Sequence, residues 1–362
     1  MFIRYILVHC YHIVKNCNPP YHLINLSTYQ PINLSTYQPI NLSTYQPITL
    51  STSQSINPRI IFMGTPEFAV ASLDALVNAG CNIVGVITAP DRPAGRGMQL
   101  QQSAVKKYAV EKGLHILQPE KLKNPAFLEE LKNLQADLQV VVAFRMLPEV
   151  VWNMPRLGTI NLHASLLPQY RGAAPINWAV INGEKETGVT TFKLQHEIDT
   201  GNILLQEKIT IGENETAGEL HDRMKIIGSK LLVKTVEALA VGMLEPIPQD
   251  QLAQDPSALK HAPKIFTETC RIDWNKPADQ IFNLIRGLSP YPAAFTYLDG
   301  KLLKIFKASK EQASPGIEPG QYEVRGQHLR FASTDGYIYA EEVQPEGKKR
   351  MKTEDFLRGW RR

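Results

Sequence analysis

Residues 138–144 read LQVVVAF, a Val-rich apolar run. A strand of this composition is buried on both faces, which is typical of a parallel sheet covered by helices. Similar short runs occur at 60–63 (IIFM) and 83–89 (IVGVITA), and residues 158–163 (GTINLH) are expected to form a fourth strand. Strands of this kind that alternate with helices predict an α/β domain built on a parallel sheet.

Helical patterns separate these strands. Thr65 is expected to be an N-cap with Pro66 at the first helical position, and the helix that follows ends at Gly80. Two more helical patterns occupy residues 103–112 and 125–134. This alternation of strand and helix is what a parallel sheet requires.

The second half of this domain adds a pair of strands and a long helix. The strands are predicted at 189–194 and 203–211, and the capping box Thr216-Ala-Gly-Glu219 begins a helix that runs to about Gly242. Residues 244–263 are rich in Pro, Gln and Asp and show no periodicity, so they are expected to be a linker.

The chain changes character after the linker. A helix is predicted at 277–288, and short alternating strands follow, with turn signals at 299–300, 325–326 and 335–336. This pattern predicts a small β-rich domain, most simply a barrel. The predicted organisation is an extension at 1–57, an α/β domain at 58–243, the linker at 244–263 and a β-domain at 264–362.

The extension differs from the rest of the chain. Residues 24–47 repeat INLSTYQP three times, and residues 1–57 contain no Asp or Glu. Such a polar, proline-containing repeat has little apolar surface to offset its ordering entropy, so we expect it to be disordered. The first residues resemble a signal peptide only weakly, because two histidines interrupt the apolar run and no cleavage site follows.

Cysteine use and hydropathy bear on where the protein works. The four cysteines, at positions 10, 17, 81 and 270, form no Cys-x-x-Cys pair, so neither a zinc site nor a disulfide framework is indicated. No apolar run reaches the roughly 18 residues of a membrane-spanning helix. We therefore expect a reduced, cytoplasmic protein with no membrane partner.

Charge is distributed unevenly along the chain. The formal net charge is +4 overall, with −2 in residues 58–260 and +4 in residues 261–362. The total excludes a polybasic protein, but it leaves the second domain electropositive. Lys348, Lys349 and Arg350 lie in its most basic stretch, which on charge alone could equally be a solvated surface.

Several nucleotide and metal motifs are missing. The turn at 64–67 (GTPE) has too few glycines to wrap a pyrophosphate, and the chain contains neither a Walker loop nor a His-Glu-x-x-His motif. A nicotinamide dehydrogenase, an NTPase and a metal hydrolase are therefore disfavoured.

Three polar residues stand out instead. Asn161 and His163 lie two apart near the end of a predicted strand, so both side chains point to the same side. An Asn amide can donate to an oxyanion, and a His can exchange a proton near neutral pH. Asp199, in a predicted turn, could orient His163. From the residues alone, hydrogen bonds to loop backbone are the simpler explanation for Asn161 and His163, and an ordinary Asp-Thr-Gly turn is the simpler explanation for Asp199.

Residues 161–172 (NLHASLLPQYRG), together with Asp-Thr-Gly at 199–201, resemble the folate-dependent formyltransferase superfamily. The loop 90–97 (PDRPAGRG), the turn 64–68 (GTPEF) and the β-domain resemble the branch whose members act on an aminoacylated tRNA. The resemblance covers essentially all of 58–362. It implies a Rossmann-like parallel-sheet formyltransferase domain followed by a small, OB-like β-barrel domain.

The resemblance also implies an activity, namely transfer of the formyl group of 10-formyltetrahydrofolate to the α-amino group of methionine on initiator tRNA. No metal is implied, and we expect a monomer. The superfamily's catalytic residues correspond to Asn161, His163 and Asp199. Its folate-binding loop corresponds to Ser165, Leu166, Leu167 and Pro168.

By the same resemblance, Arg92 and Arg96 would contact the tRNA acceptor end, and Lys348, Lys349 and Arg350 would hold the tRNA backbone. One departure is visible, because Phe144-Arg145 stands where the family usually has Tyr-Gly. An arginine is therefore expected at the rim of the folate side of the pocket.

Other functions remain open at this point. A formyltransferase acting on a small amine, such as a sugar nucleotide or glycinamide ribonucleotide, would share the Asn–His–Asp set but have no use for the basic loop. The same objection applies to water as the acceptor. A catalytically silent RNA-binding protein would not require all three polar residues.

Overall fold

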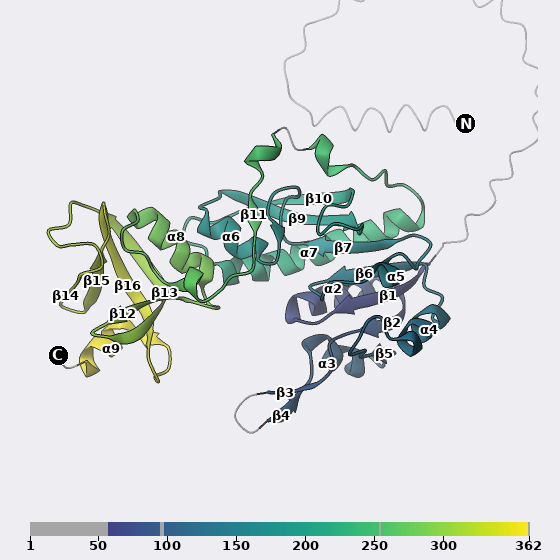
Figure 1. Ribbon diagram of the computed structural model, residues 1–362, viewed down its shortest axis with the longest axis horizontal. Coiled ribbons are helices and arrows are strands. Elements are labelled where there is room, and N and C mark those ends of the chain that lie inside the picture. The colour runs from purple at the N-terminus through teal and green to yellow at the C-terminus, as the bar shows by residue number, and fades with distance from the viewer. Residues whose placement is uncertain (1–56, 95–97, 253–254, 361–362) are drawn as a thin grey trace, which may run out of the picture. The chain divides into compact units, whose positions relative to one another are not determined.

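A computed structural model describes residues 57–94, 98–252 and 255–360 of the chain (Figure 1). The disorder expected for the extension lies outside these residues. Within them, no helix has the length and apolar character needed to cross a membrane.

The strands between residues 59 and 210 include a seven-stranded sheet in the order β10-β9-β7-β6-β1-β2-β5. The pairs among β7, β6, β1, β2 and β5 are parallel, whereas β7–β9 and β9–β10 are antiparallel. The predicted mostly parallel sheet is confirmed. The strands are β1 (Arg59–Gly64), β2 (Asn82–Ile87), β5 (Ile116–Leu117), β6 (Leu138–Val142), β7 (Thr159–His163), β9 (Glu186–Lys193) and β10 (Ile203–Thr210).

Helices bury both faces of this sheet. Alternate residues of β1 divide between two cores, with Ile60 and Phe62 in one and Ile61 and Met63 in the other. This division explains why the strands are apolar at almost every position. The helices are α2 (Glu67–Asn78), α3 (Ala104–Glu111), α4 (Pro125–Asn133), α5 (Glu149–Trp152), α6 (Pro175–Ile181) and α7 (Ala217–Ala240).

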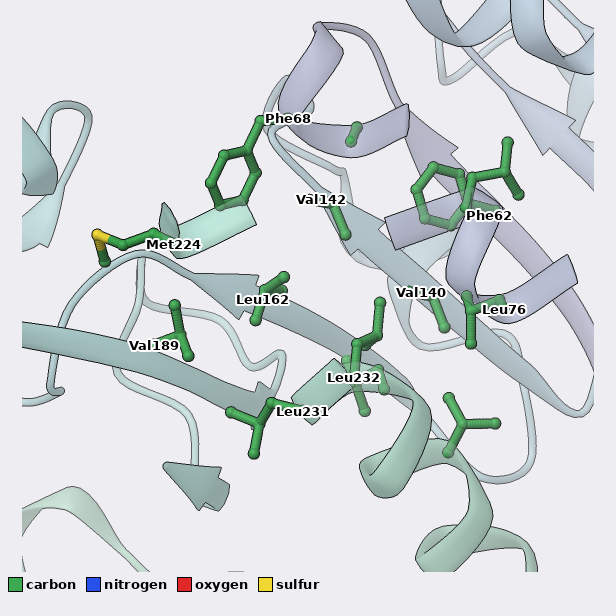
Figure 2. Close-up of a cluster of buried hydrophobic side chains, with 14 of the residues drawn as sticks. Phe62, Phe68, Leu76, Val140, Val142, Leu162, Val189, Met224, Leu231 and Leu232 are labelled. Carbon is green, nitrogen blue, oxygen red and sulfur yellow. The ribbon is translucent and has the colours of Figure 1, made fainter. Parts of the chain in front are cut away.

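Helices α2 and α7 pack against each other over the first of these cores. Figure 2 shows Phe62, Val140 and Leu162, from three neighbouring strands, with Leu76 of α2 and Leu232 of α7. These side chains are at most 4% exposed. The strand that ends in Asn161 and His163 is therefore anchored by a well-buried core.

Of two predicted helix starts, the structure confirms one and contradicts the other. The capping box is confirmed, because the Thr216 and Glu219 side chains each accept from the other residue's backbone N–H. The expectation that Thr65 is an N-cap is wrong. Helix α2 begins at Glu67, and its N-cap is Pro66, whose backbone is extended and whose side chain has no oxygen to cap the helix.

The strands between residues 294 and 352 form an antiparallel sheet in the order β12-β13-β16-β15-β14, with β17 paired to β16. Asp299 and Gly300 both have positive φ between β12 and β13, as a tight hairpin turn requires. The elements are α8 (Ala278–Leu288), β12 (Ala294–Leu298), β13 (Lys301–Gln312), β14 (Tyr322–Arg325), β15 (His328–Ala332), β16 (Gly336–Pro345), β17 (Met351–Lys352) and α9 (Thr353–Gly359).

The segment expected to be a linker has short elements of its own. It contains the 3-10 turns η5 (Gln249–Gln251) and η6 (Pro256–Ala258), followed by β11 (His261–Ala262). Strand β11 pairs in parallel with β8 (Arg171–Gly172). The absence of periodicity therefore does not mean that the segment lacks contacts with the α/β domain.

Candidate active site

Asn161 and His163 lie at the carboxyl end of β7, as the sequence predicts. Val141 of β6 is the neighbour of Asn161 on one side, and Phe192 and Thr190 of β9 lie opposite Asn161 and His163 on the other. His163 is only 6% exposed. Asn161 is half-buried, and no partner bonds its side-chain amide anywhere in the described chain. The amide is therefore available to a ligand.

The structure brings His163 and Asp199 together. His163 Nε2 lies 2.9 Å from the Tyr170 carbonyl, which can only accept, so Nε2 carries a hydrogen. The Nδ1 edge faces Asp199 Oδ2 at 3.9 Å. That oxygen also accepts from the Gly172 backbone N–H at 3.0 Å. A separation of 3.9 Å is too long for a hydrogen bond but within the range of an electrostatic contact between the two side chains.

The loop after β7 is tied to the sheet by its own polar groups. The Ser165 hydroxyl, fully buried, donates to the Gln169 carbonyl at 2.6 Å. Thr190 Oγ1 donates to the Ser165 carbonyl and accepts from the Leu167 N–H. Gln206 Nε2 donates to the Leu167 carbonyl at 2.8 Å. The Ser165 hydroxyl is therefore occupied within the protein rather than facing a ligand.

Few groups of this loop are left for a cofactor. Among the described residues, neither the Leu166 N–H nor the Pro168 carbonyl has a backbone partner. These two groups and the Asn161 amide are hydrogen-bonding groups that a folate could use. Binding of a folate by Ser165, Leu166, Leu167 and Pro168 stays a prediction.

Gln249 is a site residue that sequence reasoning missed. It is 2% exposed, and its amide oxygen accepts from Arg171 Nε and Nη2 at 2.9 and 2.6 Å. Its amide nitrogen donates to the carbonyls of Asp199 and Gly201, both at 2.8 Å. A segment assigned as a linker therefore fixes the turn that holds Asp199. A single glutamine in an aperiodic stretch gives no sequence signal for this role.

Two glycines allow close backbone approaches around Asp199. A Cβ on Gly201 would lie 1.7 Å from the Lys193 carbonyl oxygen. Gly172 has a φ of +125°, and a Cβ there would lie 2.4 Å from the Ala262 carbonyl oxygen. The Gly of Asp-Thr-Gly and the Gly of Tyr-Arg-Gly are thus required by backbone packing.

Tyr170 has a positional role that sequence reasoning also missed. Its φ is +59°, and its hydroxyl donates to Glu184 and accepts from Asn182. Burial, followed by the neighbouring Glu184 carboxylate, raises the pKa of the Tyr170 hydroxyl well above its usual range. The ring is therefore a neutral anchor, and it fixes the carbonyl that receives His163 Nε2.

Arg145, in the loop that follows β6, bonds the loop that follows β5. Its guanidinium donates to the carbonyls of Pro119 and Glu120 and lies 5.7 Å from the centroid of the Phe144 ring. Partial burial and the nearby charge of Arg92 lower the pKa of Arg145. Arg145 therefore lies within electrostatic reach of Arg92, at the position where the sequence departs from the family pattern, and its place at the rim of a folate pocket stays a prediction.

The predicted tRNA contacts differ in their surroundings. Arg92 is exposed at the start of the hairpin β3 (Arg92–Ala94) and β4 (Gln99–Gln101), whereas Arg96 lies outside the described residues. Lys348 and Lys349 are exposed after β16. Arg350 instead pairs with Glu342 and lies 4.4 Å from the centroid of the Phe306 ring. Its charge is therefore already compensated.

Among the described residues, no group of three or more His, Cys, Asp or Glu side chains is arranged to hold a metal ion. The expectation that the chemistry needs no metal stays a prediction.

Comparisons with known proteins identify the family of the chain. Residues 58–236 match the Formyl transferase family model, and residues 264–361 match the model of the Formyl transferase C-terminal domain. Proteins named methionyl-tRNA formyltransferase are similar over nearly their whole length. That of Parabacteroides distasonis is 56% identical over 84% of this chain and 96% of its own, and that of Bacteroides thetaiotaomicron is 53% identical over the same shares.

Solved structures share the fold. The N-formyltransferase from Helicobacter canadensis, in complex with folinic acid and dTDP-3-aminofucose, has a TM-score of 0.60 at 22% identity and covers 80% of this chain and 99% of its own. HypX from Aquifex aeolicus, in complex with tetrahydrofolic acid, has a TM-score of 0.55 at 17% identity, over 83% of this chain and 47% of its own. The chain belongs to the formyl transferase family.

Proposed function

We propose that this protein transfers the formyl group of 10-formyltetrahydrofolate to the α-amino group of methionyl-initiator-tRNA. The observation that supports it most is the convergence of Asn161, His163 and Asp199 at one edge of the sheet, in a chain more than half identical to a relative named for this reaction. The donor's identity rests on the family, and the acceptor's identity rests on the relatives' names.

In the proposed reaction the neutral amine attacks the formyl carbon. The C=O pair moves onto oxygen, and the tetrahedral intermediate then expels N10 of the folate, which takes up a proton as the attacking nitrogen loses one. The free amide of Asn161 can donate to the oxyanion. A proton on His163 Nδ1 supplies a compensating positive charge, and Asp199 stabilises that cation across 3.9 Å.

We propose that the tRNA is bound mainly through its phosphates. The residues beyond 261 have a net charge of +4, and Lys348 and Lys349 are exposed without an ion-pair partner in the described chain. Arg92 and Arg96 would act on the acceptor end from the hairpin. Arg350 contributes less than the sequence suggests, because Glu342 already neutralises it.

We further infer a monomer that works in the cytoplasm, where tRNA is aminoacylated. We retain the division into 58–243, 244–263 and 264–362. The two family models support it, since they match 58–236 and 264–361 and leave the middle segment unmatched.

The deciding experiment incubates the purified protein with 10-formyltetrahydrofolate and one of three acceptors: methionyl-initiator-tRNA, an amino sugar nucleotide or glycinamide ribonucleotide. Formyl transfer to the tRNA alone is the expected result. Transfer to a small amine at a comparable kcat/KM would replace this function with the small-amine alternative. Release of free formate in every case would indicate that water is the acceptor.

A further inference from the structure

The hairpin that carries Arg92 stands apart from the main sheet. Its strands β3 and β4 are three residues long each and form a two-stranded sheet of their own. Figure 1 shows them extending away from the seven-stranded sheet, next to α3. An isolated two-stranded hairpin is only marginally stable in water. The direction of this hairpin therefore depends on the contacts at its base.

The chain that enters the hairpin is held by the Asp91 carboxylate. One carboxylate oxygen accepts from Lys106 Nζ of α3, and the other accepts from Gln118 Nε2, directly after β5, at 2.9 Å. The same Gln118 nitrogen donates to the Ala89 carbonyl at 2.8 Å. A helix and a loop are therefore both bonded to the residue immediately before Arg92.

The chain that leaves the hairpin is held as well. The hydroxyl oxygens of Thr88, buried directly after β2, and Ser103, the N-cap of α3, lie 2.7 Å apart. Ser103 Oγ also accepts from the Lys106 backbone N–H at 3.0 Å. Lys106 therefore acts on both sides of the base, because its ammonium group bonds the entering chain and its backbone bonds the leaving chain.

The ion pair between Asp91 and Lys106 also decides which charges the hairpin presents. The hydrogen bond from Lys106, followed by that from Gln118, lowers the pKa of Asp91 below its usual 3.8, so the carboxylate is ionised at neutral pH. Among the described residues, no carboxylate lies within ion-pair distance of the exposed Arg92. Lys106 therefore occupies the neighbouring carboxylate and leaves the charge of Arg92 available to a phosphate.

We propose that Asp91 is a positioning residue for tRNA, which sets the direction of the hairpin through its bonds to Lys106 and Gln118. The hairpin then carries Arg92 and Arg96 to the acceptor end at a fixed angle. The proposal rests on the function given above. These arginines lie one and five positions beyond Asp91, so a tilt at the base displaces both of them. The bonded side chains lie outside the apolar cores of the α/β domain, so the ion pair can be removed without opening a cavity there.

The first test measures the binding of unacylated initiator tRNA to Asp91→Ala, with no formyl donor present. This variant loses one negative charge, so charge alone predicts tighter binding of a polyanion. A misdirected hairpin predicts the opposite, and we expect Kd to rise on the order of tenfold. Tighter or unchanged binding would overturn the proposal.

Lys106→Met removes the same ion pair with the opposite change of charge. It should raise Kd more than Lys107→Met, in which an exposed neighbouring lysine loses the same charge. The double variant Asp91→Ala with Lys106→Met has the net charge of the wild type. Because both substitutions remove one contact, the double variant should bind tRNA about as weakly as Asp91→Ala. Recovery of wild-type affinity would mean that charge alone caused the single effects, and the positioning role would be wrong.

Formylation kinetics separate the hairpin from the site itself. For methionyl-tRNA, kcat/KM of Asp91→Ala should fall about as much as the affinity does, whereas KM for 10-formyltetrahydrofolate should stay at the wild-type value. Methionyl-adenosine has no acceptor stem for the hairpin to reach, so Asp91→Ala and the wild type should formylate it equally. An equal loss with both acceptors would contradict the proposal, since it would place the damage in the site.

The binding measurement also distinguishes this proposal from the proposed function, because it requires no formyl transfer. If the wild type fails to formylate methionyl-tRNA but binds tRNA more tightly than Asp91→Ala and the double variant, the function is wrong and the positioning role stands. If the wild type formylates methionyl-tRNA and all the variants bind it equally well, the function stands and Asp91 does not direct the hairpin.

Discussion

The side-chain amide of Gln249 donates a hydrogen bond of 2.8 Å to the main-chain carbonyl of Asp199. Through this bond the segment after the long helix α7 fixes the turn that presents the Asp199 carboxylate to His163. The same glutamine accepts two hydrogen bonds from Arg171. Gln249 is therefore a positioning residue, which acts on the site without facing it.

Gln249→Ala leaves the Arg171 guanidinium and two carbonyls without their buried partner. We expect the free energy of unfolding to fall by about 1–3 kcal/mol. We also expect kcat to fall on the order of tenfold, because Asp199 loses its fixed geometry. Urea denaturation measures the free energy of unfolding, and kcat determined across a range of pH measures the effect on the site. Gln251→Ala, an exposed change in the same turn, should match the wild type. An unaltered kcat and pH profile would reduce Gln249 to a purely structural role.

Asn161→Ala should lower kcat about 100- to 1000-fold, the typical effect of removing one donor to an oxyanion. Because its amide has no other partner in the described chain, the melting temperature should change little. Steady-state kinetics and circular dichroism provide the two readouts, with the exposed Asn214→Ala as the matched control. Near-normal turnover in Asn161→Ala would assign the oxyanion to other groups.

Gly201→Ala should destabilise the fold by more than about 3 kcal/mol, because the added Cβ would lie 1.7 Å from a carbonyl oxygen that cannot move without breaking the β9–β10 end. Gly316→Ala, where a Cβ meets nothing within 4 Å, is the matched control. Thermal melts of the two variants test this. Similar melting temperatures would show that the turn around Asp199 is looser than the structure indicates.

The capping box at the start of α7 should make stability depend on pH. The backbone N–H of Thr216, followed by its hydroxyl, lowers the pKa of Glu219 below its usual 4.5. A lowered folded pKa means that the unfolded state takes up the proton first as the pH falls. The stabilisation by Glu219 is therefore full well above pH 4.5 and is lost as the pH falls through the lower folded value.

Glu219→Gln should consequently be less stable than the wild type at pH 7, by about 0.5 kcal/mol given the exposed position. The difference should shrink as the pH falls below 4.5. Urea denaturation at several pH values measures it, and Glu213→Gln, an exposed acid outside the box, should show no such trend. A gap that widens in acid would contradict the assignment.

Arg145→Ala should raise KM for the folate donor, because a carboxylate of the donor loses a neighbouring cation. The rise should be at most about fivefold, as expected for an exposed ion pair. KM for methionyl-tRNA should not change. Kinetics with each substrate varied in turn decide the point, and a rise confined to the tRNA would place RNA phosphate at Arg145 instead.

Most of the longer strands and helices of the α/β domain could be predicted because their signals are local. Val-rich runs, glycine stops and the capping box each act within a few residues, and all of these have counterparts in the structure. Thr65 failed as an N-cap because Pro66, already in an extended conformation, took that position. Patterns of this kind locate a helix better than they locate its first residue.

The contacts that complete the site could not be predicted in the same way. The residue types and the shared motif both suggest that Asp199 meets His163, whereas Gln249 lies 50 positions from Asp199 in a stretch without periodicity. Likewise, the charge of Arg350, directly before β17, is neutralised by Glu342 of the paired strand β16. Charge counted along the chain cannot show which cations are already paired.

The pairing of β11 with β8 limits how this protein can be recombined with its relatives. A chimera joined at residue 243 would give one parent's Asp199 turn the other parent's Gln249 and β11, and the contacts between them would be mismatched. A junction near residue 264 keeps each parent's set intact, including the close approach of Gly172 to Ala262. Chimeras that exchange only residues 264–362 should therefore inherit residues 244–263 from the parent that supplies the sheet.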